Sequence, residues 1–301
     1  MRVTATMLAN SLIANLDAGQ ARLQQLQEEA ATGQRFQYPA DNPEAVTATM
    51  NLNQALADIR RYLSNITAAQ NFLNTTAGAL QQMTTNLNRA LALGIQAQSG
   101  TNSPQDLSAI GEQLQQLSTE IATILNTQYQ GVYIFAAANP QTTVATGSPP
   151  ADQNLAASAA TAVKDTLPIG HQASVTENIN GYELGGTSVL AAALNAVESL
   201  QQAVVSGNPS SITTAVSSLQ AIIPEVTEES TIVGARLERL TAQASRLGTL
   251  KTDLEQSVAT VSGANMARVT TNLALEEQAL KAALESGAQV LPLSLLNFIQ
   301  P

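Results

Sequence analysis

Apolar residues recur along most of this chain at alternating spacings of four and three, which defines an apolar seam. In the N-terminal region the seam consists of Leu12, Leu16, Gly19, Leu23, Leu26 and Ala30. This spacing is typical of a helix that packs in a coiled coil. The helix is expected to end at Gly33, because glycine readily adopts the left-handed conformation found after helix C-termini. Residues 34–39 cannot continue it, since the residue before Pro39 is forced into an extended conformation.

A second and much longer helix is expected directly afterwards. Asp41 or Asn42 can cap its N-terminus, and Pro43 suits the first helical position because its missing N–H needs no partner there. The seam then continues through residues 52–91. At 1.5 Å per residue, a helix that runs on toward Pro104 would be about 80 Å long. That length predicts a rod rather than a compact globule.

The middle of the chain differs in its pattern of apolar and polar residues and in its composition. A short turn predicts that the next seam, at 107–124, folds back antiparallel on the long helix. Residues 129–135 are rich in aromatic side chains and read as a strand. Residues 140–187, rich in proline, glycine, serine, threonine and alanine, predict a small β-rich insertion. Within it, Val175–Ile179 and an Asn180-Gly181 turn suggest a short hairpin.

Helical spacing returns in the C-terminal half. The seams lie at 190–200, 212–223, 233–261 and, past Gly263, 266–284, and the chain closes with an apolar tail at 292–299. Pro224 is expected to kink or end its helix, because proline lacks the N–H and clashes with the preceding turn. The two ends of the chain carry the strongest amphipathic stretches, and neither is expected to be stable alone. They are therefore predicted to pair with each other and to leave the middle to project sideways.

Composition narrows the class of function. Charged residues make up 12% of the 301 residues and apolar residues 44%, so uncharged polar side chains must solvate the surface. The formal net charge of −10 argues against a nucleic-acid-binding protein, whose binding surface is basic. The chain has no cysteine, which excludes disulfides, thiolate metal sites and cysteine nucleophiles. Few aromatic and titratable residues are left to line an enzyme pocket.

Targeting signals are weak. No apolar run approaches the ~18 residues needed to cross a bilayer. The N-terminus has one arginine and a broken apolar stretch, unlike a cleaved secretory leader. We expect a protein that is cytoplasmic, or one that is exported by a route without a cleaved leader.

The residues that could carry chemistry are few. His171 is the single histidine, and a triad with Asp165 and Ser174 would rest on sequence proximity alone. The glutamates within 225–229 could bind a metal, but acidic residues at the start of a helix explain them better, since the helix dipole favours negative charge there. We therefore expect no catalytic residue, no metal and no cofactor, and hence a protein that is not an enzyme.

Four stretches, spread over both ends and the middle, are similar to motifs of one known family. They are Ala31-Thr32-Gly33-Gln34-Arg35 with Pro39-Ala40-Asp41-Asn42-Pro43, then Tyr129-Gln130-Gly131-Val132-Tyr133-Ile134-Phe135-Ala136, then Val233-Gly234-Ala235-Arg236-Leu237-Glu238-Arg239-Leu240, and finally Leu280-Lys281-Ala282-Ala283-Leu284 with Leu293-Ser294-Leu295-Leu296-Asn297-Phe298. In this order they resemble the bacterial flagellin superfamily over the whole chain apart from the insertion. The C-terminal ending favours the branch that joins the flagellar hook to the filament.

The sequence departs from the family pattern at three places. Asn42 replaces the second aspartate of the turn motif, and Phe36 replaces its usual isoleucine. Residues 262–267 stand where the family typically has an acidic stretch. Contacts made by those carboxylates are therefore not expected here, although the fold is unaffected.

The resemblance implies a structural axial subunit of the flagellum that adapts the hook to the filament. Such a subunit is exported unfolded through the flagellar type III channel to the extracellular flagellum and polymerises through its terminal helices. The implied partners are other copies of itself in a ring, a neighbouring hook-associated protein and flagellin, and an export chaperone, with no nucleic acid and no membrane. The implied fold is mainly α with a small β-rich insertion, an elongated flagellin-like antiparallel helical bundle built from N- and C-terminal segments.

The resemblance also implies a division into domains. An inner-core domain takes its N-terminal helix and turn from 1–42 and its C-terminal helix and tail from 263–301. A rod domain takes a long helical hairpin and strand from 43–139 and the returning helices from 188–262. The small β-rich insertion occupies 140–187.

The extreme termini carry more apolar side chains than one helix pair can bury, which predicts contacts between subunits. The expected assembly interface consists of Val3, Met7, Leu8, Leu12, Leu16, Leu23, Leu26, Val269, Leu273, Leu280, Leu284, Leu295, Leu296 and Phe298. Asp17 is the only acidic residue in the first 27, which agrees with a seam that packs against other copies.

Two alternatives remain open at this point. One is a flagellin that forms the bulk of the filament. The other, from a different class, is a type III secreted amphipathic protein that interacts with a membrane. The second alternative requires lysine and arginine beside the apolar stripe, whereas these seams are flanked by glutamine, asparagine and threonine.

Overall fold

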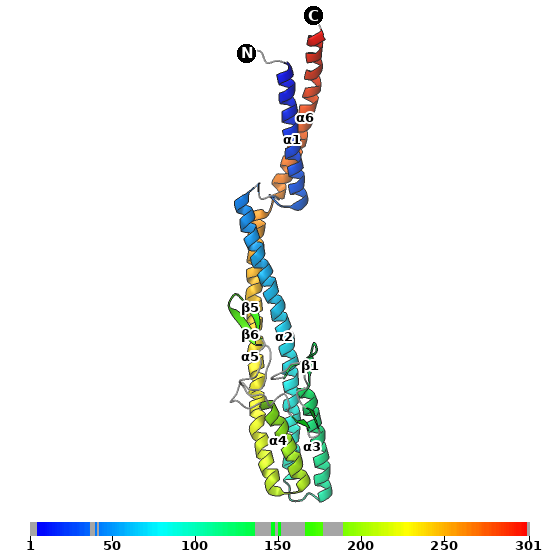
Figure 1. Ribbon diagram of the computed structural model, residues 1–301, viewed down its shortest axis with the longest axis vertical. Coiled ribbons are helices and arrows are strands. Elements are labelled where there is room, and N and C mark those ends of the chain that lie inside the picture. The colour runs from blue at the N-terminus through cyan, green and yellow to red at the C-terminus, as the bar shows by residue number, and fades with distance from the viewer. Residues whose placement is uncertain are drawn as a thin grey trace. The chain divides into compact units, whose positions relative to one another are not determined.

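The computed structural model describes residues 5–36, 40, 42–135, 146–147, 150–151, 166–176 and 189–299. These residues are mainly helical, as the sequence predicts (Figure 1). The helices are α1 (Ala5–Thr32), α2 (Pro43–Ala97), α3 (Pro104–Leu125), α4 (Val189–Ser206), α5 (Pro209–Ser262) and α6 (Met266–Ile299). The predicted mainly α fold with a small β-rich insertion is confirmed.

The chain divides into two units, each with its own internal contacts. The terminal unit consists of Met1–Asp58 and Leu250–Pro301, and the central unit consists of Ile59–Thr249. The long helices α2 and α5 each contribute one end to the terminal unit and the remainder to the central unit. The terminal unit therefore contains both ends of the chain.

The boundaries of the first two helices confirm the sequence prediction. Gly33 follows α1 with a φ of 67°, the left-handed conformation expected of a C-terminal glycine. The side chain of Asn42 accepts a hydrogen bond from the Ala45 N–H at 3.0 Å, so Asn42 caps α2, and Pro43 is its first residue. The 55 residues of α2 give it a length of about 80 Å.

The core of the central unit is closely packed. In α3, the seam residues Leu114, Leu117 and Ile121 are buried, and in α4 the residues from Leu190 to Leu200 bury almost one whole side of the helix. These two helices lie against each other, and the bare backbone at Gly111 makes room for Val205. Helix α3 follows α2 after a short connection, and the two helices line a common groove.

The aromatic segment after α3 differs from its prediction. It is not one strand but a tight hairpin of β1 (Gln128–Tyr129) and β2 (Val132–Tyr133). Gln130 and Gly131 both have positive φ values, 52° and 82°, as a two-residue type I′ turn requires. Two-residue strands are too short to show an alternating pattern, which is why the turn was missed. The segment then ends in fully buried Ile134 and Phe135.

The described part of the insertion contains two further hairpins. They are β3 (Thr146–Gly147) with β4 (Pro150–Ala151), and β5 (Thr166–Gly170) with β6 (Ala173–Thr176), all antiparallel. Val175 belongs to the second strand of a hairpin that turns at residues 171–172, and the predicted Asn180-Gly181 turn lies outside the described residues. The amides of Asn65 and Gln243 donate to the carbonyls of Pro168 and Ile169, which ties β5 to α2 and α5.

Of the two outcomes predicted for Pro224, a kink or the end of its helix, the second is wrong. Helix α5 does not end at Pro224 but continues through it. Ile222 and Val226 on either side of the proline are buried, and this packing offsets the loss of one backbone hydrogen bond. Consequently Glu225 and Glu228 are exposed residues in the middle of a helix, not acids at its start.

The seams on the two sides of Gly263 belong to separate helices, since α5 ends at Ser262 and α6 begins at Met266. The apolar tail is part of α6, which is helical as far as Ile299. The linker between α5 and α6 therefore lies beside the linker that follows α1, since Gly263 pairs with Gln34.

Candidate assembly surface

Helices α1 and α6 lie side by side in the terminal unit, which confirms the predicted pairing of the two chain ends (Figure 1). Arg22 Nε donates to Glu276 Oε1 at 2.9 Å and forms an ion pair across the two helices. One turn further along, Gly19 is buried, and a Cβ atom placed there would lie 3.4 Å from Leu280 Cδ1. These contacts fix which faces of the two helices meet.

The seam between α1 and α6 is only partly covered. Six of its fourteen predicted interface residues are half-buried, namely Leu12, Leu16, Leu23, Leu26, Leu273 and Leu280. Val269 is buried, with 5% of its surface exposed. A pair of helices leaves the flanks of each seam open, because covering an apolar stripe completely requires further helices around it. The pair therefore presents apolar surface that no described residue of this chain covers.

Among the described side chains of α1 and α6, four large apolar ones have more than half of their surface exposed. Two were predicted as interface residues, Met7 at 63% and Leu284 at 53% exposed. Two were missed, Ile13 at 56% and Leu275 at 60%. Both lie one or two residues beside a seam position, so a search for the four-three spacing passes over them. An apolar residue adjacent to a seam is the signal that could have found them.

The remaining predicted interface residues are not described in the same detail. Val3 lies outside the described residues. Leu8 lies in α1, and Leu295, Leu296 and Phe298 lie in α6, but their side chains are outside the described part of the structure. Their contribution to an interface stays a prediction.

The linkers at the base of the helix pair bind each other. Gln34, which follows α1, forms an isolated antiparallel bridge with Gly263, which follows α5. The Arg35 N–H donates to the Ser262 carbonyl at 2.8 Å, and the Ala264 N–H donates to the Gly33 carbonyl at 2.8 Å. The two breaks in the helices are thus held together by backbone hydrogen bonds.

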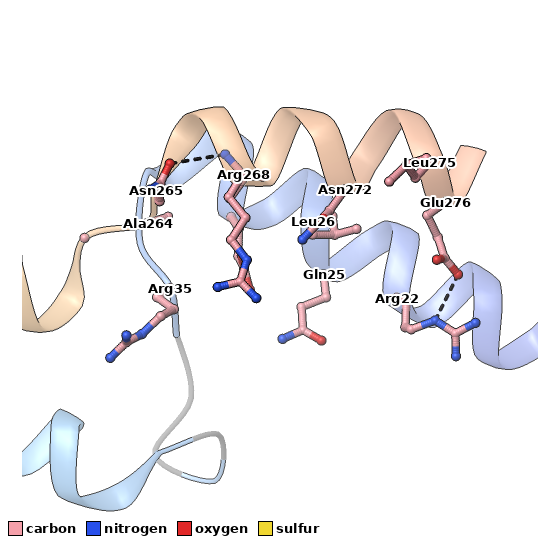
Figure 2. Close-up of a pocket in the computed structure, with 13 residues that line it drawn as sticks. Arg22, Gln25, Leu26, Arg35, Ala264, Asn265, Arg268, Asn272, Leu275 and Glu276 are labelled. Atoms are coloured by element: carbon pink, nitrogen blue, oxygen red, sulfur yellow. Dashed lines mark hydrogen bonds and ion pairs between the residues drawn. The ribbon is translucent and has the colours of Figure 1, made fainter. Parts of the chain in front are cut away.

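Next to this bridge, α1 and α6 enclose a cleft of about 660 Å³ (Figure 2). Its charged lining consists of Arg22, Arg35, Glu29, Glu276 and Arg268. Arg22 is engaged with Glu276, whereas the exposed Arg268 side chain extends from the first turn of α6 into the cleft. The cleft is therefore a locally basic region in a chain with a net charge of −10. It is suited to receive amide and carboxylate side chains of a partner.

The structure describes only part of the candidate triad. His171 lies in the exposed turn between β5 and β6, and Asp165 is outside the described residues. The Ser174 carbonyl accepts a hydrogen bond from Arg239, which anchors the hairpin to α5. Within the described residues, no three potential metal ligands gather in one place.

In the part of the chain that the structure describes, one helix is long and apolar enough to span a membrane, although the sequence contains no uninterrupted apolar run of that length. It is α4, and 56% of it is buried within the structure. A core helix that is mostly buried inside a protein can have the same length and composition as a helix that spans a membrane. The burial of α4 is typical of such a core helix. This helix therefore gives only weak support to the membrane alternative.

Comparison with known proteins shows what the chain is similar to. Residues 3–140 match the bacterial flagellin N-terminal helical region, which confirms the resemblance to the flagellin superfamily predicted from the four motifs. More particularly, the chain is 29% identical over 137 residues to flagellar hook-associated protein 3 of Salmonella typhimurium, covering 45% of this chain and 43% of that protein. It is also 29% identical over 126 residues to the phase 1 flagellin of Salmonella naestved, covering 42% of this chain and 25% of the flagellin. The matches thus span less than half the length of these relatives.

Solved structures show that the fold is shared with flagellar hook-associated proteins. A flagellar hook-associated protein of Vibrio parahaemolyticus matches with a TM-score of 0.64 and 17% identity, covering 74% of this chain and all of that one. Hook-associated protein 3 of Legionella pneumophila matches with a TM-score of 0.60 and 11% identity, covering 70% of this chain and 98% of that one. FlgL of Bacillus cereus matches with a TM-score of 0.58 and 18% identity, covering 69% of this chain and 99% of that one. At these identities the similarity establishes the fold alone.

Proposed function

We propose that this chain is a structural axial subunit of the bacterial flagellum, which acts as the adaptor between hook and filament and polymerises through its terminal helices. The observation that carries the proposal is the half-covered α1–α6 pair, with Met7, Ile13, Leu275 and Leu284 exposed. The match of residues 3–140 to the bacterial flagellin N-terminal helical region supports the same proposal. The C-terminal ending at residues 293–298, which resembles the hook–filament junction branch of the superfamily, favours the junction over the bulk filament.

Other copies of the chain are the partner that fits the exposed seam best. Burying apolar surface contributes about 25 cal/mol per Å², so each uncovered side chain favours association. The seams hold few charges, and charges are costly to bury at an interface core. A ring of identical rods would cover the flanks of α1 and α6 that a single pair leaves open. A neighbouring hook-associated protein and flagellin would cover the two faces of that ring.

The route to the outside follows from the same role. The subunit would be exported unfolded through the flagellar type III channel, with a chaperone that protects its terminal helices, and would function in the extracellular flagellum. A chain without cysteine needs no disulfide chemistry before or after export. We assign it no catalytic activity, because its proposed work consists of contacts between subunits.

We further propose that the boundary between inner core and rod lies at the linkers. Residues 1–42 and 263–301 would form the inner-core domain, 43–139 and 188–262 the rod domain, and 140–187 the insertion. The ends of α1 and α5 and the starts of α2 and α6 all fall at these linkers, which supports the division. Backbone contacts alone group the neighbouring ends of α2 and α5 with α1 and α6.

Deletion of the gene tests the junction role directly. Cells that lack the protein should build intact hooks but release flagellin into the medium unassembled, because the hook then offers no surface for the filament. Electron microscopy of the cell surface and immunoblots of the medium measure the two effects. Filaments of normal length in the deletion strain would contradict the proposal.

Removal of the last ten residues tests the terminal contacts. The central unit should stay folded, since it contains the closely packed core, and circular dichroism should show nearly unchanged helicity. Incorporation into the flagellum should be lost, because the end of α6 is missing. Normal incorporation of the shortened chain would remove the terminal helices from the proposal.

A filament-forming flagellin is the alternative that a specific observation favours. The match to flagellin has the same identity and nearly the same extent as the match to hook-associated protein 3. Purified protein distinguishes the two functions, because a flagellin should grow long filaments by itself and a junction subunit should not.

A further inference from the structure

We propose that the pairing of the two linkers, called the linker bridge, sets the register in which α1 and α6 pack. The linker bridge consists of Gly33, Gln34 and Arg35 with Ser262, Gly263 and Ala264. In an ordinary helical hairpin a short covalent loop determines which residues of the two helices lie opposite each other. Here no loop joins α1 to α6, so another element must perform that task. The inference rests on the proposed function only in making this helix pair the assembly surface.

The bridge has the directionality that this role requires. Its two backbone hydrogen bonds, from Arg35 to Ser262 and from Ala264 to Gly33, are both 2.8 Å long and antiparallel. A slip of one residue would break both bonds and would place different residues opposite Gln34. Because α1 ends and α6 begins next to the bridge, such a slip would pass directly into both helices.

Arg35 strengthens the same connection through its side chain. Its Nη2 atom donates to the Val261 carbonyl at 3.1 Å, one of the last carbonyls of α5, which have no partner within the helix. A cation at a helix C-terminus is also favoured by the helix dipole. Arg35 thus binds two successive carbonyls, Val261 and Ser262, from a segment more than 200 residues away.

The contacts along α1 and α6 agree with a register counted from the bridge. At 1.5 Å per residue, Arg22 and Glu276 lie about 18 and about 20 Å from the bridge along their helices, and they form the ion pair. Gly19 and Leu280 lie about 23 and about 26 Å from it, and they are in contact. The two helices therefore run outward level with each other from a common origin.

Gly263 is the residue on which the bridge depends. A Cβ atom at this position would overlap the carbonyl oxygen of Ala259, part of the α5 backbone that cannot move aside easily. The absence of a Cβ atom lets the backbone of residue 263 lie against the Ala259 carbonyl, and in this conformation residue 263 pairs with Gln34. Gly263 and Arg35 are accordingly positioning residues for the proposed assembly surface.

Engineered disulfides can measure the register, because the natural chain has no cysteine. The in-register pair is Gly19→Cys with Leu280→Cys, whose side chains are placed to meet. The shifted pair is Gly19→Cys with Leu273→Cys, which would meet only if α6 slipped by one heptad. Each pair is introduced into the full chain, and the rate of disulfide formation with a mild thiol oxidant is followed by gel electrophoresis of the free protein.

With the natural linkers, the in-register pair should close at least about tenfold faster than the shifted pair. With Gly263→Ala the ratio should fall to within about threefold, since the loss of the bridge permits slipping. Arg35→Ala should reduce the ratio less, because it leaves the backbone bonds intact. Gly234→Ala is the matched control: it lies in α5 with open space around it and should leave the ratio unchanged.

Two results would overturn the inference. One is a wild-type chain in which the two cysteine pairs close at similar rates. The other is a Gly263→Ala chain that keeps both the wild-type ratio and the wild-type helicity by circular dichroism. If Gly263→Ala loses helicity, Arg35→Ala decides instead, and an unchanged ratio in that variant overturns the inference. The assay contains no hook or filament, so the proposed function can fail in the deletion strain while the register result stands.

Discussion

The same four-three pattern gives two different kinds of packing in the two units. In the central unit, seam residues such as Leu80, Leu87 and Leu114 are fully buried, because α2, α3, α4 and α5 surround one core. In the terminal unit, seam residues such as Leu16 and Leu280 remain half-exposed between only two helices. The four-three pattern therefore indicates only that a helix packs against other helices. Whether those helices belong to the same chain depends on how many helices surround the seam within that unit.

Truncation of seam leucines should show the largest contrast between the units. Leu80→Ala should destabilise the free protein by about 2–5 kcal/mol, because it leaves a cavity in a closely packed core. Leu16→Ala should cost less than about 1 kcal/mol, because its site is already partly open to water. Chemical denaturation followed by circular dichroism measures both. Equal losses would show that the terminal pair is packed as tightly as the core.

Glycine-to-alanine substitutions sharpen the comparison at the level of single contacts. At Gly94 an added Cβ would lie 2.8 Å from Val216 and 2.9 Å from Leu200, so Gly94→Ala should destabilise by about 1–3 kcal/mol. At Gly19 the nearest atom is 3.4 Å away, so Gly19→Ala should be tolerated and gain up to about 1 kcal/mol of helix propensity. Gly78→Ala, in open space on α2, calibrates the propensity gain. A destabilising Gly19→Ala would contradict loose packing between α1 and α6.

Polar substitutions of the exposed residues separate folding from assembly. Leu275→Ser should change the unfolding free energy by less than about 0.5 kcal/mol, because the side chain is mainly exposed in the free subunit. Its incorporation into flagella should nevertheless fall severalfold in a competition with the wild-type chain. Ile95→Ser, at a similarly exposed position in the central unit, is the control and should incorporate normally. If both variants incorporate equally well, Leu275 is not part of the interface.

The smallest expected effect concerns acid. The backbone N–H of Ser103, and then its hydroxyl, donate to the Asp106 carboxylate at the start of α3 and lower its pKa below the ordinary 3.8. The stabilising contribution is therefore complete above pH 3.8 and is lost as the pH falls through the lowered folded-state value. Helix α6 is capped instead by Asn265, which does not titrate. Amide exchange at the two helix starts should show that only α3 loosens in acid, and Asp106→Asn should remove the difference.

Local signals in the sequence were sufficient for most helices. Gly33, Asn42 and Pro43 mark helix ends because their backbone preferences act within a few residues. The helix through Pro224 could not be predicted in this way, because buried neighbours outweigh the local penalty of a proline. The β1–β2 hairpin could not be predicted for a different reason, since its two-residue strands are too short to show an alternating pattern of apolar and polar residues.

The candidate site was predictable only in part. The pairing of the chain ends follows from two incomplete seams, but the exposure of Ile13 and Leu275 depends on how α1 and α6 are rotated against each other. The linker bridge joins Gln34 to Gly263, and no local pattern relates residues so far apart. The cleft arises from that geometry, so it could not be anticipated from composition or spacing.

The position of the two ends in one helix pair also has a consequence for timing. Arg22 and Glu276 are separated by 254 residues, so their ion pair is among the least local contacts of the chain. Contacts of this kind form late, because the entropy of closing so large a loop must be overcome first. A chain that is still being synthesised lacks α6, and it therefore cannot form the proposed assembly surface. Because α1 lies near one end of the chain and α6 near the other, this surface can form only once the last segment is present.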